Sequence, residues 1–410
     1  MMSNSVKPHV HIAIPAMEEY YYIPETINCI EKQTYQNLST QICVNQPDNW
    51  WNTTDKIHVC LNNQQTLEYL KSINLSNSSL NIIDKSSRGN GWKSKKSGVG
   101  HARKLLMDNI ISHASDDDDI ILSMDADTKF NPGYINSVAE IFKNNPKAVA
   151  LANPYYHHLT GDESIDRPML RYEVYMRSYT INLLRIGSPY SFTAFGSVIS
   201  MPVWAYKKIR GITPKESGED FYLLQKLRKM GHIILYNYEV VYPASRISDR
   251  VPYGTGPAIS KSLTEQQASY PVFKPEFFDE VKETYNLFED LFYKDIKTPM
   301  SDFFKHIFKT DDIFSPLRNN YKTSEKFVNA CHNKIDGLRV FQFLKWRSAN
   351  EEAEDEKSLL KLMKVLNLND WGKEEARFEK LNFHSYPVSE INNIRDYLFK
   401  IENELRAKYI

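Results

Sequence analysis

The chain has 410 residues, of which 41% are hydrophobic and 25% are charged, and its formal net charge is zero. This size and composition are typical of a folded globular protein with two domains, or with one large domain and an appendage. No block of the sequence concentrates Lys and Arg as a nucleic-acid surface would, so we expect no nucleic-acid partner.

Cysteine spacing and apolar runs indicate the compartment. The four cysteines are scattered singly, without the spacing of a zinc site or the density of a disulfide scaffold. The N-terminus lacks the apolar core of a signal peptide, and no stretch approaches the ~18 to 20 apolar residues that span a bilayer. We therefore expect a cytoplasmic protein with free thiols and no transmembrane segment.

Short β-branched runs alternate with amphipathic segments through the first part of the chain. The runs predict strands at residues 10–14, 38–44, 80–84, 119–124, 148–153, 197–201 and 232–237. Apolar residues at helical spacing predict helices at residues 24–33 and 100–114, and another from Glu219 onwards. This alternation is typical of βαβ units, so we expect an α/β fold with a mostly parallel sheet flanked by helices.

From about residue 270 the β-branched runs disappear, and the sequence predicts helices to its end. We therefore expect an α/β domain at residues 1–265 and a helical C-terminal region at residues 266–410. The last segment has a 3-4-3-4 apolar pattern, formed by Ile391, Ile394, Leu398, Ile401 and Leu405. The pattern covers only two heptads, which favours packing against the chain itself over a homodimer through the C-terminal helices.

Six aspartates surround the strand expected at residues 119–124. Asp125 and Asp127 follow its C-terminal end, where open α/β sheets bind ligands. Asp116 to Asp119 precede it, about 17 to 20 Å away at ~3.3 Å per residue, so we expect them to solvate the opposite edge. In near-extended backbone Asp125 and Asp127 point to one side, which suits Mg²⁺ or Mn²⁺ carrying a diphosphate. An Asp-rich turn that caps the next helix is the alternative.

A second acidic pair, Glu219 and Asp220, opens the helix predicted in GEDFYLLQKLRKMG. Acidic residues in a first helical turn are favoured by the helix dipole, which alone would account for the pair. The alternative is functional, with one carboxylate facing the ligand edge and removing a proton from an acceptor hydroxyl.

Five motifs stand in a characteristic order: a strand ending in Pro15 with Glu18 after it, then GVGHARK, SMDAD, FGSVISM and GEDFYLLQKLRKMG. In this order, residues 8–245 resemble the family 2 glycosyltransferases. The resemblance implies a GT-A fold and the transfer of a hexosyl group from a UDP- or GDP-sugar to a carbohydrate or lipid-linked acceptor. It places Pro15 and Glu18 among the residues that contact the donor.

The same resemblance implies the chemistry of the site. It implies that Asp125 and Asp127 bind a Mn²⁺ or Mg²⁺ ion. It also implies inversion at the anomeric carbon, with Asp220 as the base and Glu219 supporting or orienting it. The leaving group is a nucleoside diphosphate, whose developing charge a metal stabilises, so only the acceptor hydroxyl needs a proton acceptor.

The resemblance extends to donor contacts on the strand ends, with departures. The family commonly has an aspartate-rich end to its second strand, where this chain has CVNQPDNWW, so Asn45 or Asp48 is expected at the base. Arg103 carries over as a diphosphate or base-side contact. Asp84, at the end of the third strand, either meets the nucleoside or begins a turn.

Two loops contain cations and glycines. The segment YPASRISDRVPYGTGPAI at residues 242–259 places Arg246 and Arg250 beside a Gly-Thr-Gly hinge, and we expect it to close on the donor diphosphate. The loop at residues 84–100 is either a phosphate cradle or a solvated loop, because its G-x-G lacks the dinucleotide pattern.

Three other classes compete with an inverting transferase. A retaining transferase on the same fold would keep the aspartate pair and need no base at Asp220. A sugar nucleotidyltransferase normally has a Gly-rich basic loop directly after its first strand, where this chain has IPAMEEYYY. A non-catalytic nucleotide-sugar-binding protein would bind the donor and never turn it over.

Overall fold

The computed structural model describes residues 7–93, 97–215, 218–235, 238–246, 270–349 and 351–409. The chain divides into two compact units. The first holds residues 1–161, 194–260 and the last two residues, and the second holds residues 162–193 and 261–408.

A seven-stranded sheet forms the centre of the first unit, with the order β3-β2-β1-β4-β7-β6-β8. Its strands are β1 (Val10–Ala16), β2 (Leu38–Asn45), β3 (Ser79–Lys85), β4 (Ile120–Ser123), β6 (Ala150–Ala152), β7 (Ile199–Pro202) and β8 (Ile233–Ile234). The strands β3, β2, β1 and β4 are parallel, whereas β7 runs antiparallel to β4 and β6. The predicted mostly parallel sheet is therefore confirmed, with β7 reversed.

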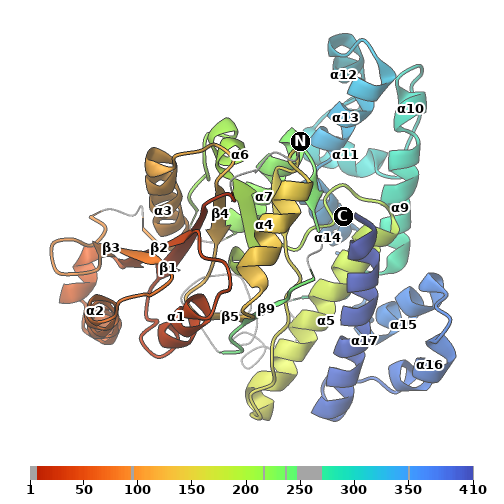
Figure 1. Ribbon diagram of the computed structural model, residues 1–410. Helices are drawn as coiled ribbons and strands as arrows, with labels where there is room; N and C mark the ends of the chain where they lie inside the picture. The colour runs from red at the N-terminus through yellow and green to blue at the C-terminus, as the bar shows by residue number, and fades with distance from the viewer. Residues whose placement is uncertain are drawn as a thin grey trace, which may run out of the picture. The chain divides into compact units, whose positions relative to one another are not determined.

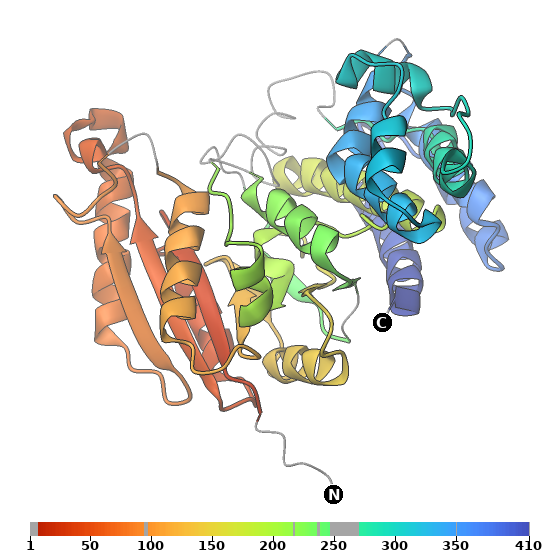
Figure 2. The ribbon, with the colours of Figure 1, turned by 90° about the horizontal axis from the view of Figure 1, so that it is seen from above.

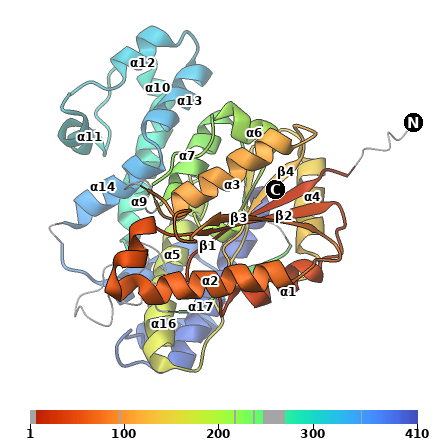
Figure 3. The same cartoon turned by 90° about the vertical axis from the view of Figure 1, so that its left-hand side faces the viewer.

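Helices cover both faces of this sheet (Figure 1). They are α1 (Ile23–Glu31), α2 (Ile57–Ser72), α3 (Val99–His113), α4 (Tyr134–Asn144), α6 (Val203–Lys208) and α7 (Glu219–Met230). Figure 3 shows α1 and α2 on one face and α3 on the other, and Figure 2 shows α3, in orange, lying along the strands.

The order of the strands explains why α3 lies on the opposite face of the sheet from α1 and α2. The chain steps from β1 outward to β2 and β3, then returns past β1 to β4, and right-handed crossovers place the connecting helices of the two directions on opposite faces. Such a reversal leaves a crevice at the carboxyl ends of β1 and β4, which is where open α/β sheets bind ligands.

A small second sheet, which the sequence pattern did not predict, pairs β5 (Thr128–Phe130) with β9 (Val241–Pro243). Each strand has only three residues, too few for the periodic signal of a strand. Its antiparallel register places Thr128 opposite Pro243. The segment after Pro243 is thereby brought to the segment before Thr128, where Asp127 lies.

The aspartates before β4 differ in environment. Asp116, Asp117 and Asp118 are exposed, as expected for residues that solvate the start of a strand. Asp119 is only 4% exposed, and its carboxylate accepts hydrogen bonds from the backbone N–H groups of His9 (2.9 Å) and Asp116 (3.1 Å). The expectation that all four are solvating is wrong for Asp119, because this carboxylate joins the start of β1 to the start of β4.

The second unit is helical. Its helices are α5 (Glu163–Arg185), α9 (Pro275–Asn286), α10 (Phe288–Leu291), α11 (Ser301–Phe308), α12 (Ser315–Asn320), α13 (Ser324–Lys334), α14 (Gly337–Ser348), α15 (Asp355–Leu366), α16 (Trp371–Glu379) and α17 (Val388–Arg406). The predicted helical C-terminal region is confirmed. Among the described helices, none is both long enough and apolar enough to cross a bilayer.

The last helix, α17, packs along α5 (Figure 1). Its apolar stripe is buried at Ile391, Ile394, Leu398 and Ile401. The prediction that this segment packs against its own chain is confirmed, and a homodimer through the C-terminal helices stays a prediction. The boundary expected at residue 265 did not anticipate that α5, from the middle of the chain, joins the C-terminal helices.

Buried ion pairs fix α17 on α5. Arg177 and Glu173 pair within α5, Arg177 also donates to Glu402 of α17 (2.7 Å), and Arg395 of α17 pairs with Glu173. All four side chains are at most 2% exposed. Removing one member would leave its buried neighbours with fewer counter-ions, which destabilises the protein. The pairs therefore specify one register of the two helices.

Candidate active site

The guanidinium of Arg103, on α3, joins two carboxylates at the carboxyl edge of the sheet. Its Nη2 donates to Asp125 Oδ1 (2.7 Å) and its Nε donates to Glu219 Oε1 (3.1 Å). Its Nη1 donates to the hydroxyl of Ser123 and to the carbonyl of Gly196 (3.3 Å). Burial lowers the pKa of Arg103, but the charges of Asp125 and Glu219 outweigh it, so the pKa is raised.

The burial of Arg103 decides what this residue can do. The side chain is 3% exposed, and its N–H groups point at protein acceptors. In this arrangement it positions Asp125 and Glu219. The expected contact between Arg103 and a donor diphosphate stays a prediction.

The motif FGSVISM places Gly196 and Ser197 against Asp125. A Cβ at Gly196 would lie 2.2 Å from Arg103 Nη2 and 3.0 Å from Asp125 Oδ1, so a larger residue would have to displace the guanidinium. Ser197 Oγ donates to Asp125 Oδ2 (2.8 Å). The glycine therefore lets Arg103 reach Asp125, and the serine holds the other carboxylate oxygen.

Asp220 follows Glu219 at the start of α7 and is partly exposed. Burial and then the charge of Glu219 raise the pKa of Asp220, Arg103 lowers it, and the net result is a pKa of about 7. The backbone N–H of Phe221 donates to Asp220 Oδ1 (2.7 Å). A carboxylate with a pKa near 7 is well matched to accept a proton at neutral pH.

Asp127 lies in a turn and not in extended backbone, since the N–H of Thr128 donates to the carbonyl of Asp125 (3.3 Å). The two aspartates of the pair consequently meet different arginines. Asp125 is bound by Arg103, whereas Asp127 Oδ2 lies 2.6 Å from Arg246 Nη2. The expectation of two carboxylates in near-extended backbone is not met.

Arg246 is also bound by Glu19, a residue that the sequence did not single out. Arg246 Nη2 donates to both carboxylate oxygens of Glu19, at 2.6 and 2.8 Å, and the guanidinium carbon lies 4.0 Å from the centre of the Tyr22 ring. Burial lowers the pKa of Arg246, but the charges of Asp127 and Glu19 raise it more. The acidic pair after β1 was the available signal, although nothing in the pattern favoured Glu19 over Glu18.

Asp127 also borders a cavity of about 340 Å³ in the first unit. Aromatic side chains line much of it, among them Tyr21, Tyr22 and Tyr242. The ring of His158 stacks on Tyr242, with centroids 4.7 Å apart. Such a lining, beside a carboxylate, suits a ring-shaped polar ligand.

The donor set of Asp125 and Asp127 fits a hard divalent cation in kind, because it consists of carboxylate oxygens on side chains that are 36% and 15% exposed. Mg²⁺ and Mn²⁺ commonly take one or two protein carboxylates and complete their shell with phosphate oxygens and water. Within the described ranges, no group of three or more His, Cys, Asp or Glu side chains could hold a metal. A cation at this edge would therefore complete its shell with water or with oxygens from a ligand.

The polar residues at and just after the end of β2 make hydrogen bonds within the protein. Asn45 is 2% exposed, donates to the carbonyl of Ala16 (3.0 Å) and accepts from Trp92 Nε1 (3.2 Å). Asp48 accepts from the backbone N–H of Gly89 (2.7 Å). These contacts tie the loop after β3 to the loop after β2.

Asp84 begins a turn. Its Oδ1 accepts from the backbone N–H groups of Ser86 and Ser87, both at 2.9 Å. Burial would raise the pKa of Asp84, but these hydrogen bonds and that from Asn90 lower it to about 2. The turn, one of the two alternatives for this residue, is what the structure contains, and contact with a nucleoside stays a prediction.

The remaining residues expected at the donor lie on other elements. Pro15 is buried in β1, opposite Cys43 of β2. The Glu18 side chain is 33% exposed, and its Oε1 lies 3.6 Å from His58 Nε2. Arg250, and the rest of the loop expected to close on the donor, lie outside the described residues.

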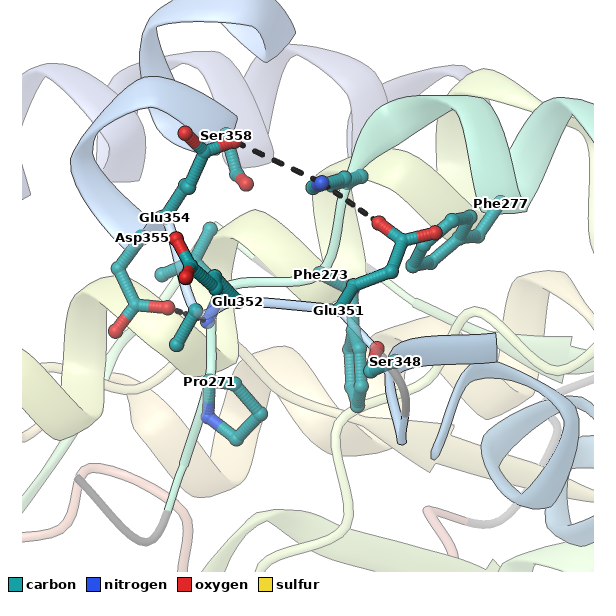
Figure 4. Close-up of a pocket in the computed structure, with 12 residues that line it drawn as sticks. Pro271, Phe273, Phe277, Ser348, Glu351, Glu352, Glu354, Asp355 and Ser358 are labelled. Atoms are coloured by element: carbon teal, nitrogen blue, oxygen red, sulfur yellow. Dashed lines mark hydrogen bonds and ion pairs between the residues drawn. The ribbon is translucent and has the colours of Figure 1, made fainter. Parts of the chain in front are cut away.

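A second cavity, of about 220 Å³, lies in the helical unit (Figure 4). Its acidic rim is engaged in contacts within that unit. Lys274 Nζ lies 2.6 Å from Glu351 and 3.6 Å from Glu354, while Asp355 pairs with Arg171 and accepts from the backbone N–H of Val272 (2.8 Å). These contacts hold helices together, so we place the candidate site at the sheet edge.

Comparison with known proteins gives remote structural likenesses. No protein-family model matches the sequence, and no curated protein matches it. S. aureus TarS 1–349, solved in complex with UDP-GlcNAc, is similar with 13% identity, over 98% of this chain and 92% of that chain, at a TM-score of 0.39. The mannosyltransferase PcManGT from Pyrobaculum calidifontis, solved with GDP-Man and Mn²⁺, is similar with 12% identity, over 98% and 88%, also at 0.39. We base the function on the side chains of the site, because likenesses this remote say nothing of activity.

Proposed function

We propose that this chain is a glycosyltransferase that moves a sugar from a UDP- or GDP-sugar to the hydroxyl of a carbohydrate or lipid-linked acceptor. The observation that carries the proposal is the group of Asp125, Arg103, Glu219 and Asp220 at the carboxyl edge of the sheet. In this group one carboxylate, that of Asp220, has its pKa raised to about 7. A proton acceptor poised near neutrality, beside a second carboxylate that is oriented and still exposed, suits displacement at a sugar carbon.

Asp220 accepts the proton of the acceptor hydroxyl in this proposal. The bond from the acceptor oxygen to the anomeric carbon forms as the bond from that carbon to the diphosphate breaks, and the leaving nucleoside diphosphate keeps the electron pair. Attack opposite the leaving group inverts the anomeric carbon. Arg103 holds Glu219 in place, and the charge of Glu219 raises the pKa of Asp220, which makes Asp220 a better proton acceptor.

Asp125 and Asp127 are the residues that would hold Mn²⁺ or Mg²⁺. When bound, such an ion stabilises the charge that develops on the leaving diphosphate. Arg103 and Ser197 keep Asp125 in place through one carboxylate oxygen each.

Contacts to the donor follow from the same arrangement. We assign Arg246 and Arg250 to the diphosphate, because guanidinium groups bind phosphate oxygens in pairs. We assign Pro15, Glu18, Asn45 and Asp84 to the nucleoside side as neighbours at the ends of β1, β2 and β3. Their own hydrogen bonds mean that Asn45 and Asp84 would act mainly by shaping the loops there.

A thermal-shift screen of nucleotide-sugars with and without Mn²⁺ tests the class of the protein. One donor should raise the melting temperature only when the metal is present, because a ligand that binds the folded state stabilises it. Product analysis with that donor then gives the anomeric configuration. A retained configuration would favour the retaining alternative, and binding without any turnover would favour a non-catalytic protein.

A further inference from the structure

Arg246 lies against one carboxylate oxygen of Asp127. Its Nη2 lies 2.6 Å from Asp127 Oδ2, a distance typical of a charge-assisted hydrogen bond. The pair is largely enclosed, since the two side chains are 13% and 15% exposed. A cation bound at that oxygen would stand directly against the guanidinium, and two positive groups so close repel each other strongly.

Arg246 has a second partner that does not depend on Asp127. The same nitrogen donates to both oxygens of Glu19, whose side chain is 7% exposed, and the guanidinium lies over the ring of Tyr22. One guanidinium thus serves two carboxylates in this arrangement. If Asp127 bound a metal cation in place of Arg246, Glu19 and Tyr22 would still hold Arg246 near Asp127.

We propose that Arg246 and the divalent cation compete for Asp127, and that Glu19 is the positioning residue that keeps Arg246 at the site after the exchange. The donor diphosphate then makes two favourable contacts. Its oxygens bind the metal, and they accept the hydrogen bonds of Arg246 that Asp127 has lost. This inference rests on the proposed function, since it concerns the metal and diphosphate of that reaction.

The test measures binding of Mn²⁺ alone to the nucleotide-free protein, from the electron paramagnetic resonance signal of free Mn²⁺. Removing the competitor in Arg246→Met should lower the Mn²⁺ dissociation constant at least about tenfold, as expected when a like charge leaves a partly enclosed site. Glu19→Gln should raise it, because Arg246 would then pair with Asp127 alone.

Lys129→Met is the matched control. Lys129 lies two residues from Asp127 and borders the same cavity, but it pairs with Glu25 at 3.4 Å. Its loss removes the same charge without freeing Asp127, so the Mn²⁺ dissociation constant should change less than about twofold. The double variant Asp127→Asn with Arg246→Met should not show the tighter Mn²⁺ binding of Arg246→Met.

A second measurement, the affinity for a nucleoside diphosphate, should change in the opposite direction. In saturating Mn²⁺, UDP or GDP should bind Arg246→Met more weakly than the wild type by about tenfold, because a charge-assisted phosphate contact is lost. Tighter metal binding together with weaker diphosphate binding is a combination that a merely loosened fold would not produce. Circular dichroism and melting temperature identify any variant that fails to fold.

Three results would overturn the inference: equal or undetectable Mn²⁺ binding in the wild type and Arg246→Met, an equal gain in Lys129→Met, or a gain that survives loss of Asp127. The proposed function fails separately. If no nucleotide-sugar is ever turned over, that proposal falls while the competition for Mn²⁺ is still measured, and a transferase whose Arg246→Met variant shows no gain refutes only the inference.

Discussion

Replacing Asp220 with Asn removes the proton acceptor and keeps a side chain of nearly the same size and shape. The amide oxygen can still accept the hydrogen bond from the N–H of Phe221, now 2.7 Å from Asp220 Oδ1. A positioned general base typically contributes about 10²- to 10⁴-fold to a rate, so we expect kcat to fall by that factor. The affinity for the donor should change little, because the base acts on the acceptor.

The same substitution should stabilise the fold in a pH-dependent way. The pKa of Asp220 is raised from 3.8 to about 7, and one pKa unit is about 1.4 kcal/mol, so the upper limit is about 4 kcal/mol. Solvent reaches part of this side chain, which reduces the expected effect to about 1–2 kcal/mol.

The direction of this pH dependence follows from the number of protons that the folded and unfolded states bind. Between pH 4 and 7 the folded state keeps the proton of Asp220 and the unfolded state has lost it, so the wild type loses stability as the pH rises through this range. Asn has no proton to lose. The variant should therefore be more stable than the wild type above pH 7, and the difference should shrink towards pH 4.

Two assays check this prediction. Transfer rates measured from pH 5 to 9 should rise in the wild type towards a plateau above pH 7, and Asp220→Asn should stay low throughout. Melting temperatures across the same range give the stability difference, with the exposed Asp118→Asn as the control. A variant that keeps more than a tenth of the rate, or a stabilisation that is the same at pH 4 and pH 8, would refute the reasoning.

Further substitutions test the other parts of the site. Asp127→Ala should abolish the stabilisation of the protein by a nucleotide-sugar with Mn²⁺, and unchanged donor affinity in a thermal-shift assay would contradict the role of Asp127. Gly196→Ala should displace Arg103 from Asp125, since the added Cβ would lie 2.2 Å from Arg103 Nη2; transfer should fall at least about tenfold, and a crystal structure with the ion pair intact would count against it. Asp119→Ala should destabilise the protein by about 1–3 kcal/mol in chemical denaturation, because two backbone N–H groups lose their acceptor, and a change below 0.5 kcal/mol would show that solvent replaces it.

The sequence by itself determined the α/β class, the parallel strands and the helical C-terminal part. Continuous apolar runs of β-branched residues can form strands buried on both faces, and that information is local to each run. It also located the two acidic pairs at the ends of predicted elements. Strand polarity then assigned Asp125 and Asp127 to the carboxyl edge of the sheet without any knowledge of its neighbours.

Only the tertiary structure decided the partners of those carboxylates. Asp125 meets Arg103 because β4 lies beside β1 under α3, and Asp127 meets Arg246 because the short strands β5 and β9 pair. Three-residue strands give no periodic signal, and no spacing along the chain predicts that Glu19 rather than Glu18 turns towards Arg246. These ion pairs join different elements, up to 227 residues apart in the case of Glu19 and Arg246, so they depend on how the elements pack. The elements themselves depend on nearby residues, and this is why the chemistry of single residues could be predicted and their pairing could not.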